Sequence, residues 1–212
     1  MQTSTKKEIE DTIKYLQQKG YPEVTADLGG NLRFNYFVVS QTENPQLPDF
    51  AIAMRGRDIK EGVLLGVSDS LDEKIRKYWA AHEFIEIVQL GGELLREGDN
   101  TSTNDCLTAS ELELSLVPDD IKPGYIKRRI DFFKNLISYA KKNNYPQLDI
   151  SNFRGSLKKL QDLSHQIKAE ADLTEKIGNL YNGSNDIKTA LSNLSTASYG
   201  ATRLSKLIPT IN

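Results

Sequence analysis

The chain has 212 residues, of which 38% are hydrophobic and 26% are charged, a balance typical of a globular protein and not of a disordered one. Its formal net charge of −2 provides no overall field for nucleic acid or an anionic membrane, so neither is an expected partner. No segment approaches the roughly 18 apolar residues of a membrane span, the N-terminus has no apolar signal core, and the single cysteine, Cys106, fits a reducing compartment. These features favour a cytoplasmic protein and leave its oligomeric state open.

The first predicted element is a helix over residues 5–19. Thr5 and Glu8 form a capping box at its start, and Gly20 ends it. Its apolar stripe consists of Ile9, Ile13 and Leu16, which recur at helical spacing. We expect this apolar stripe to pack against another element of the protein.

Strand-length apolar segments follow the helix, and the first two form a hairpin pattern. Gly29 and Gly30 separate these two and supply the positive φ of a tight turn. The segments are residues 24–28, 32–38, 50–54 and 63–67. We expect them to form a small, mainly antiparallel sheet.

The pattern then becomes helical from Leu71 to about Leu90, with Asp69 and Ser70 as N-cap candidates. A loop over residues 98–104 leads to a second helix at about residues 106–117, which Pro118 closes.

From Pro123 the sequence predicts helices only. A break at residues 143–146 ends the first of them, and weaker helices follow around residues 157–167, 173–180 and 187–194. The prediction is therefore an α+β protein with a sheet packed on a central helix in residues 1–118, and a helical hairpin or bundle in residues 119–212.

The central helix carries the residues with the clearest chemical potential. His82 and Glu86 are four residues apart and share one helix face, and Glu83 follows the histidine directly. An imidazole and a carboxylate are ligands that zinc accepts, and an adjacent carboxylate can act as general base on a metal-activated water. A third ligand must come from elsewhere. The best candidates are Glu111 and Glu113 on the next helix, with Asp105 and Cys106 behind them.

The run Ala81-His82-Glu83-Phe84, with the strand-like residues 62–67 before it, resembles the edge strand and active-site helix of ImmA/IrrE-type zincin metallopeptidases. That family has a His-Glu-x-x-His helix, and residues 113–118 are similar to the end of its ligand-bearing helix. The resemblance spans residues 50–118 and rests on a short motif. It implies a metal-dependent peptidase with His82 as ligand and Glu83 as general base.

The sequence departs from the family pattern where Glu86 replaces the second histidine. A site with two carboxylates and one imidazole shifts the metal preference from zinc toward harder ions such as manganese or iron. The sequence thus predicts a metal site of His82, Glu86 and Glu113, or a catalytically degenerate relative that holds no metal.

A second interpretation makes the same residues structural. His82 beside Trp79 would then be a buried histidine bonded to a neighbour, Cys106 a small core residue, and His165 a surface residue. The basic run at residues 127–129 would be a solvated face. In this interpretation the protein is not an enzyme and binds a protein partner through its helical C-terminal half. Phosphate-binding loops, dinucleotide fingerprints and serine-esterase elbows are absent from the sequence.

Overall fold

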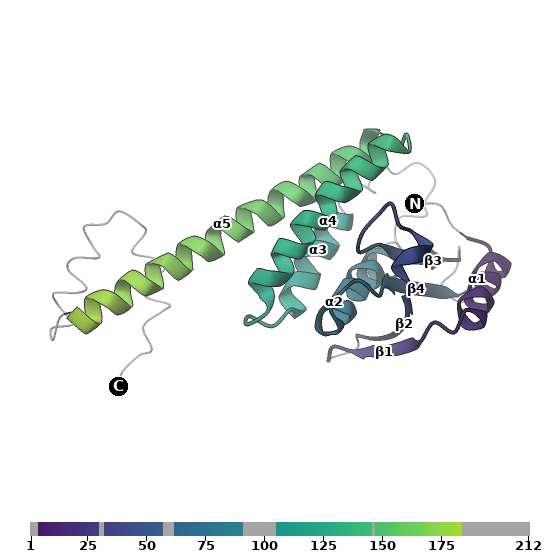
Figure 1. Cartoon of the computed structure of the whole chain (residues 1–212), viewed down its shortest axis with the longest axis horizontal. Helices are drawn as coiled ribbons and strands as arrows, with labels where there is room; N and C mark the ends of the chain where they lie inside the picture. The colour runs from purple at the N-terminus through teal and green to yellow at the C-terminus, as the bar shows by residue number, and fades with distance from the viewer. Residues whose placement is uncertain (1–3, 30–31, 57–61, 91–104, 146, 184–212) are drawn as a thin grey trace. The chain divides into compact units, whose positions relative to one another are not determined.

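The computed structural model of the chain describes residues 4–29, 32–56, 62–90, 105–145 and 147–183 (Figure 1). Its elements are α1 (Lys6–Gln18), β1 (Glu23–Asp27), β2 (Arg33–Val39), a short 3-10 helix (Gln41–Glu43), β3 (Ala51–Arg55), β4 (Val63–Ser68), α2 (Glu73–Phe84), a π-helix (Ile85–Leu90), α3 (Asp105–Leu116), α4 (Lys122–Lys142) and α5 (Gln147–Gly183). The α+β class is confirmed, because the strands lie in the N-terminal half and the helices dominate the C-terminal half.

The chain divides into two compact units, Met1–Ser164 and His165–Asn212. The sequence predicts a boundary after residue 118. Residues 119–164 instead group with the sheet, and they carry buried side chains such as Phe133 and Leu160.

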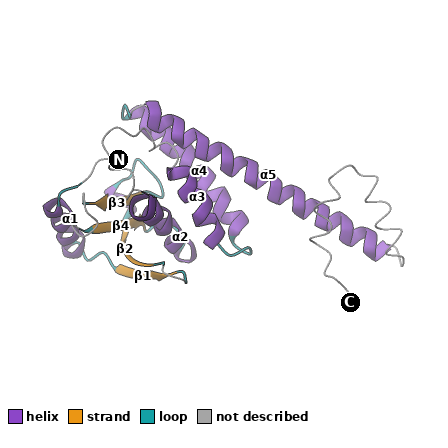
Figure 2. Ribbon diagram, turned by 180° about the vertical axis from the view of Figure 1, so that it is seen from behind, coloured by secondary structure: helices purple, strands orange, loops and turns teal. Residues whose placement is uncertain are grey.

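The N-terminal helix forms as its capping box predicts. The hydroxyl of Thr5 accepts the backbone N–H of Glu8 at 3.2 Å, and the Glu8 carboxylate accepts the backbone N–H of Thr5 at 2.6 Å. Ile9 and Leu16 on its apolar stripe are buried. In both ribbon views the strands lie between α1 and α2 (Figures 1 and 2).

The sheet has the strand order β1-β2-β4-β3. The outer pairs, β1 with β2 and β3 with β4, are antiparallel, which confirms the mainly antiparallel prediction, whereas the central pair of β2 and β4 is parallel. Gly29, at a φ of 85°, allows the tight connection between β1 and β2. Val39 and Val67 on the central strands are fully buried, so the middle of the sheet is part of the core.

The central helix begins later than predicted. Asp72 caps α2, because its carboxylate accepts the backbone N–H of Lys74 at 2.9 Å. The expectation that Asp69 or Ser70 caps this helix is wrong, since the Asp69 carboxylate accepts the backbone N–H of Gln41 and the Ser70 hydroxyl donates to Asp49. Beyond Phe84 the helix continues in the wider π form, which the periodicity of the sequence did not predict.

The C-terminal helices differ from the prediction in one respect. A single helix, α5, covers residues 147–183, where the sequence predicts separate shorter helices. Gly155 lies inside α5 and does not interrupt it, because Ile150 and Leu160 on either side are buried and hold the helix in place. The helix predicted around residues 187–194 lies outside the described residues.

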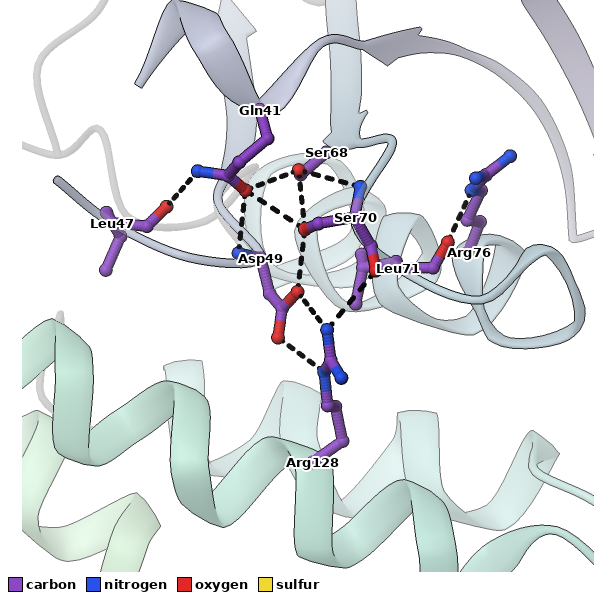
Figure 3. Close-up of polar contacts among 8 residues, drawn as sticks. All are labelled: Gln41, Leu47, Asp49, Ser68, Ser70, Leu71, Arg76 and Arg128. Carbon is purple, nitrogen blue, oxygen red and sulfur yellow. Dashed lines mark hydrogen bonds and ion pairs between the residues drawn. The ribbon is translucent and has the colours of Figure 1, made fainter. Parts of the chain in front are cut away.

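A polar network joins α4 to the C-terminal ends of the parallel strands (Figure 3). The carboxylate of Asp49, which is 5% exposed, accepts Nε–H of Arg128 at 2.5 Å, Nη2–H of Arg128 at 2.6 Å and the hydroxyl of Ser70 at 2.8 Å. The side-chain oxygen of Gln41 accepts the Asp49 backbone N–H at 3.1 Å and the Ser68 hydroxyl at 2.6 Å. This network fixes α4 against the sheet.

Among the residues that the structure describes, no helix is long and apolar enough to cross a bilayer.

Candidate metal centre

The α2 helix carries His82 into the interior of the protein. It contacts β3 and β4 as well as α3, so it is covered on more than one side and Trp79, Ala80 and Ala81 are fully buried. His82 itself is 3% exposed. A buried imidazole requires partners for its ring nitrogens, and the partners come from the π-helix and from α3.

Both nitrogens of His82 have partners. Nδ1–H donates to Oε2 of Glu113 at 2.6 Å. On the other side of the ring, Nε2 lies 3.4 Å from Oε2 of Glu86 and 3.6 Å from Sγ of Cys106. A carboxylate on Nδ1 fixes the orientation of the ring and leaves Nε2 directed at Glu86 and Cys106.

Glu113 is fully buried and is held by more than His82. The hydroxyl of Tyr125 donates to Oε1, and Nη2–H of Arg129 donates to Oε2 at 2.9 Å. Arg129 is 1% exposed, and its guanidinium lies 4.4 Å from the centre of the Trp79 ring. The prediction of a solvated basic face is therefore wrong for Arg129, because a buried carboxylate and an aromatic ring compensate its charge.

His82, Glu86 and Cys106 form a group that could hold a metal ion. Their ligand atoms all lie within 4.8 Å of one another. Tetrahedral zinc with ordinary bond lengths places a nitrogen about 3.4 Å from a carboxylate oxygen and about 3.6 Å from a thiolate sulfur. The distances from Nε2 of His82 to Glu86 and Cys106, 3.4 Å and 3.6 Å, match this geometry.

The charges of the cluster shift the pKa values of its members. Burial and the charge of Arg129 lower the pKa of His82, but Glu113 and Cys106 outweigh them and raise it well above its ordinary value of 6.5. Burial raises the pKa of Glu113, but Arg129 and His82 outweigh it and hold that pKa below 4.5. In the absence of metal, His82 and Glu113 are therefore an ion pair at neutral pH.

Glu83 has a different environment from its neighbours. Burial raises its pKa to about 7, with further upward contributions from Glu86 and Glu113 and downward ones from His82 and Arg129. A carboxyl group that titrates near neutrality can both accept and release a proton at physiological pH.

The structure brings together most of the residues that the sequence singled out. His82 and Glu86 lie at one centre, and Glu113 reaches it as a hydrogen-bond partner of His82. Glu83, the next residue on α2, interacts electrostatically with His82, Glu86 and Glu113. Glu111 faces away and pairs with Lys159 at the surface. His165 is exposed, as expected. The side chain of Asp105 lies outside the described residues.

The sequence predicts Glu113 as the third ligand, whereas Cys106 completes the group with His82 and Glu86 that could hold a metal ion. Cys106 and Glu113 are seven residues apart, two turns of α3, and this spacing places both on the face that meets α2. This spacing predicts from the sequence that Cys106 and Glu113 share one face of the helix. Tyr125 and Arg129, four residues apart on α4, share a face in the same way.

Comparison with known proteins gives no relative. No family model, no curated protein and no solved structure matches the chain.

Proposed function

We propose that the protein is a zincin-like, metal-dependent hydrolase that cleaves peptide bonds. The proposal is carried by one observation, the convergence of the ligand atoms of His82, Glu86 and Cys106 within 4.8 Å of one another, with both distances from Nε2 of His82 equal to those in a tetrahedral zinc site. The ImmA/IrrE-type resemblance of the helix supports the same reaction class.

His82 would bind the metal through Nε2, Glu86 through its carboxylate and Cys106 through its sulfur. A thiolate ligand favours zinc over manganese or iron, in contrast to a site built of two carboxylates and one imidazole. Bound zinc would lower the pKa of a water to about 7 and polarise a substrate carbonyl. Glu113 keeps the proton on Nδ1 of His82, so that Nε2 is the coordinating atom.

Glu83 is the general base. With a pKa of about 7, its carboxylate accepts a proton from the attacking water and then transfers it to the leaving amine. The same environment that raises this pKa, burial beside Glu86 and Glu113, makes Glu83 a stronger base than an exposed glutamate. We propose a peptide or protein substrate and a cytoplasmic location for this activity.

The test is the metal content of the purified protein, measured by inductively coupled plasma mass spectrometry. We expect about one zinc per chain in the wild type. His82→Ala should lose it, and His165→Ala, which changes the other histidine of the chain, should keep it. Equal metal content in the two variants would contradict the assignment.

Catalysis is tested with Glu83→Gln. This change removes the base and keeps the three ligands, so we expect full zinc content with peptide hydrolysis lowered about 10²–10⁴-fold. An unchanged rate would eliminate Glu83 as the base, and a loss of zinc would show that Glu83 supports the site.

One further observation favours a second candidate, a thiol hydrolase. Cys106, His82 and Glu113 stand in the order nucleophile, proton-transferring imidazole and orienting carboxylate, with Sγ 3.6 Å from Nε2 and Nδ1 2.6 Å from Oε2. In that reaction Sγ would attack a carbonyl carbon, the proton would pass through His82 to the leaving group, and water would hydrolyse the thioester.

The two candidates are separated by adding a chelator. A metal hydrolase loses activity on chelation, whereas a thiol hydrolase keeps it and loses it on alkylation of Cys106. If neither activity nor metal binding is found, the interpretation of a non-enzymatic protein that binds a partner through its helical half remains.

A further inference from the structure

Cys106 differs from the other ligands of the centre in its exposure and its chemistry. It is partly exposed, whereas His82 is 3% exposed. It is also the only one of the three ligand side chains that an oxidant can convert into a poorer ligand. The buried hydroxyl of Ser156 on α5 donates to its sulfur at 3.7 Å.

The chain offers Cys106 no partner for an internal disulfide, since it is the only cysteine. Oxidation of its sulfur by a hydroperoxide therefore stops first at the sulfenic acid, which low-molecular-weight thiols reduce. An anionic sulfur is a strong zinc ligand, and a sulfenic acid is not. After oxidation only His82 and Glu86 of the ligand group remain.

We propose that Cys106 is a site of reversible oxidation by hydroperoxides and that its oxidation releases the metal from the centre. The inference rests on the proposed function, because it concerns the same metal. It assigns a mode of regulation to the site, in which loss of the sulfur ligand switches the hydrolase off.

The reaction is a two-electron transfer. The Cys106 thiolate attacks one oxygen of the hydroperoxide, the S–O bond forms as the O–O bond breaks, and the leaving oxygen departs as hydroxide or alkoxide. Sulfur is oxidised and the peroxide is reduced. One external thiol then displaces water from the sulfenic acid to give a mixed disulfide, and a second thiol regenerates the Cys106 thiol with release of the external disulfide.

The experiment uses the full-length, zinc-loaded protein and hydrogen peroxide. Released zinc is followed with a chromophoric indicator, and the sulfenic acid is trapped with dimedone and located by mass spectrometry. We expect zinc to appear in proportion to the fraction of Cys106 that is oxidised, and to return to the protein after treatment with excess thiol.

Two variants control the measurement. Cys106→Asp replaces the sulfur with a carboxylate that can still coordinate, so its zinc should resist peroxide. Met54→Leu removes a partly buried methionine on β3 that peroxide could also oxidise, and it should release zinc as the wild type does. If Cys106→Asp fails to bind zinc, the wild type alone tests the inference, by whether the amount of released zinc is proportional to the amount of Cys106 trapped as the sulfenic acid.

The outcomes separate this inference from the proposed function. Zinc that stays bound while Cys106 is oxidised, or that is released before Cys106 reacts, overturns the inference and leaves the metal centre intact. A protein that binds no zinc before any oxidant is added overturns both.

Discussion

Replacement of Glu113 by glutamine should be the most damaging conservative change in the centre. The carboxylate of Glu113 accepts three donors, from His82, Tyr125 and Arg129, and it is fully buried. A glutamine has one acceptor oxygen, and its NH₂ group would face donors. The change therefore leaves a buried, charged Arg129 without its counter-ion.

The magnitude follows from this geometry. Removing one partner of a buried ion pair lowers the free energy of unfolding by about 3–5 kcal/mol, because the remaining charge stays desolvated. For a chain of this size that loss lowers the melting temperature by about 6–20 °C. The metal affinity should fall about 10–100-fold, because the orientation of His82 depends on Glu113.

A matched control lies two residues away on the same helix. Glu111 pairs with Lys159, but both side chains are about half exposed, at 49% and 53%. Glu111→Gln should therefore lower the free energy of unfolding by less than about 1 kcal/mol. Urea unfolding of both variants in the presence of a chelator measures the difference, and equal losses for Glu113→Gln and Glu111→Gln would refute the reasoning.

Three further predictions follow from the same charges and contacts. The raised pKa of His82 and the lowered pKa of Glu113 imply that both groups stabilise the metal-free fold fully between about pH 4.5 and 6.5. The melting temperature of the metal-free protein should therefore fall as the pH rises through the pKa of His82, and also as the pH drops through the pKa of Glu113. A melting temperature that stays constant over about pH 3–9 would contradict this prediction. Zinc binding at pH 6.5 should release the proton of His82, and calorimetric enthalpies that do not depend on the buffer would argue against it. Asp49→Ala should lower the free energy of unfolding by about 1–3 kcal/mol, because Arg128 and Ser70 lose their acceptor. The control variant Asp131→Ala removes an exposed partner of Lys134 and should lower the free energy of unfolding by less than about 1 kcal/mol in the same urea titration.

Local features of the fold were predictable because nearby residues determine them. The capping box of Thr5 and Glu8, the Gly29 turn and the shared helix face of His82 and Glu86 all depend on short spacings, and the structure contains each of them. The antiparallel pair β1 and β2 follows from its short connection in the same way.

Non-local features were not predictable from spacing. The parallel pairing of β2 with β4 joins strands separated by another strand, and no turn signal specifies it. The spacing of Cys106 and Glu113 predicts that they share one helix face. Which of the two contacts Nε2 of His82 depends on how α3 packs on α2. Arg129 appeared to be one residue of a solvated basic run, because only the tertiary structure brings Glu113 and Trp79 to it.

The most direct test of the metal centre is zinc K-edge X-ray absorption on the stoichiometrically loaded protein. The structure predicts one sulfur at about 2.3 Å, with nitrogen and oxygen ligands at about 2.0–2.2 Å. The sulfur shell should disappear in Cys106→Asp and persist in His165→Ala. A wild-type spectrum with nitrogen and oxygen ligands alone, or a protein that takes up no zinc, would contradict the centre of His82, Glu86 and Cys106.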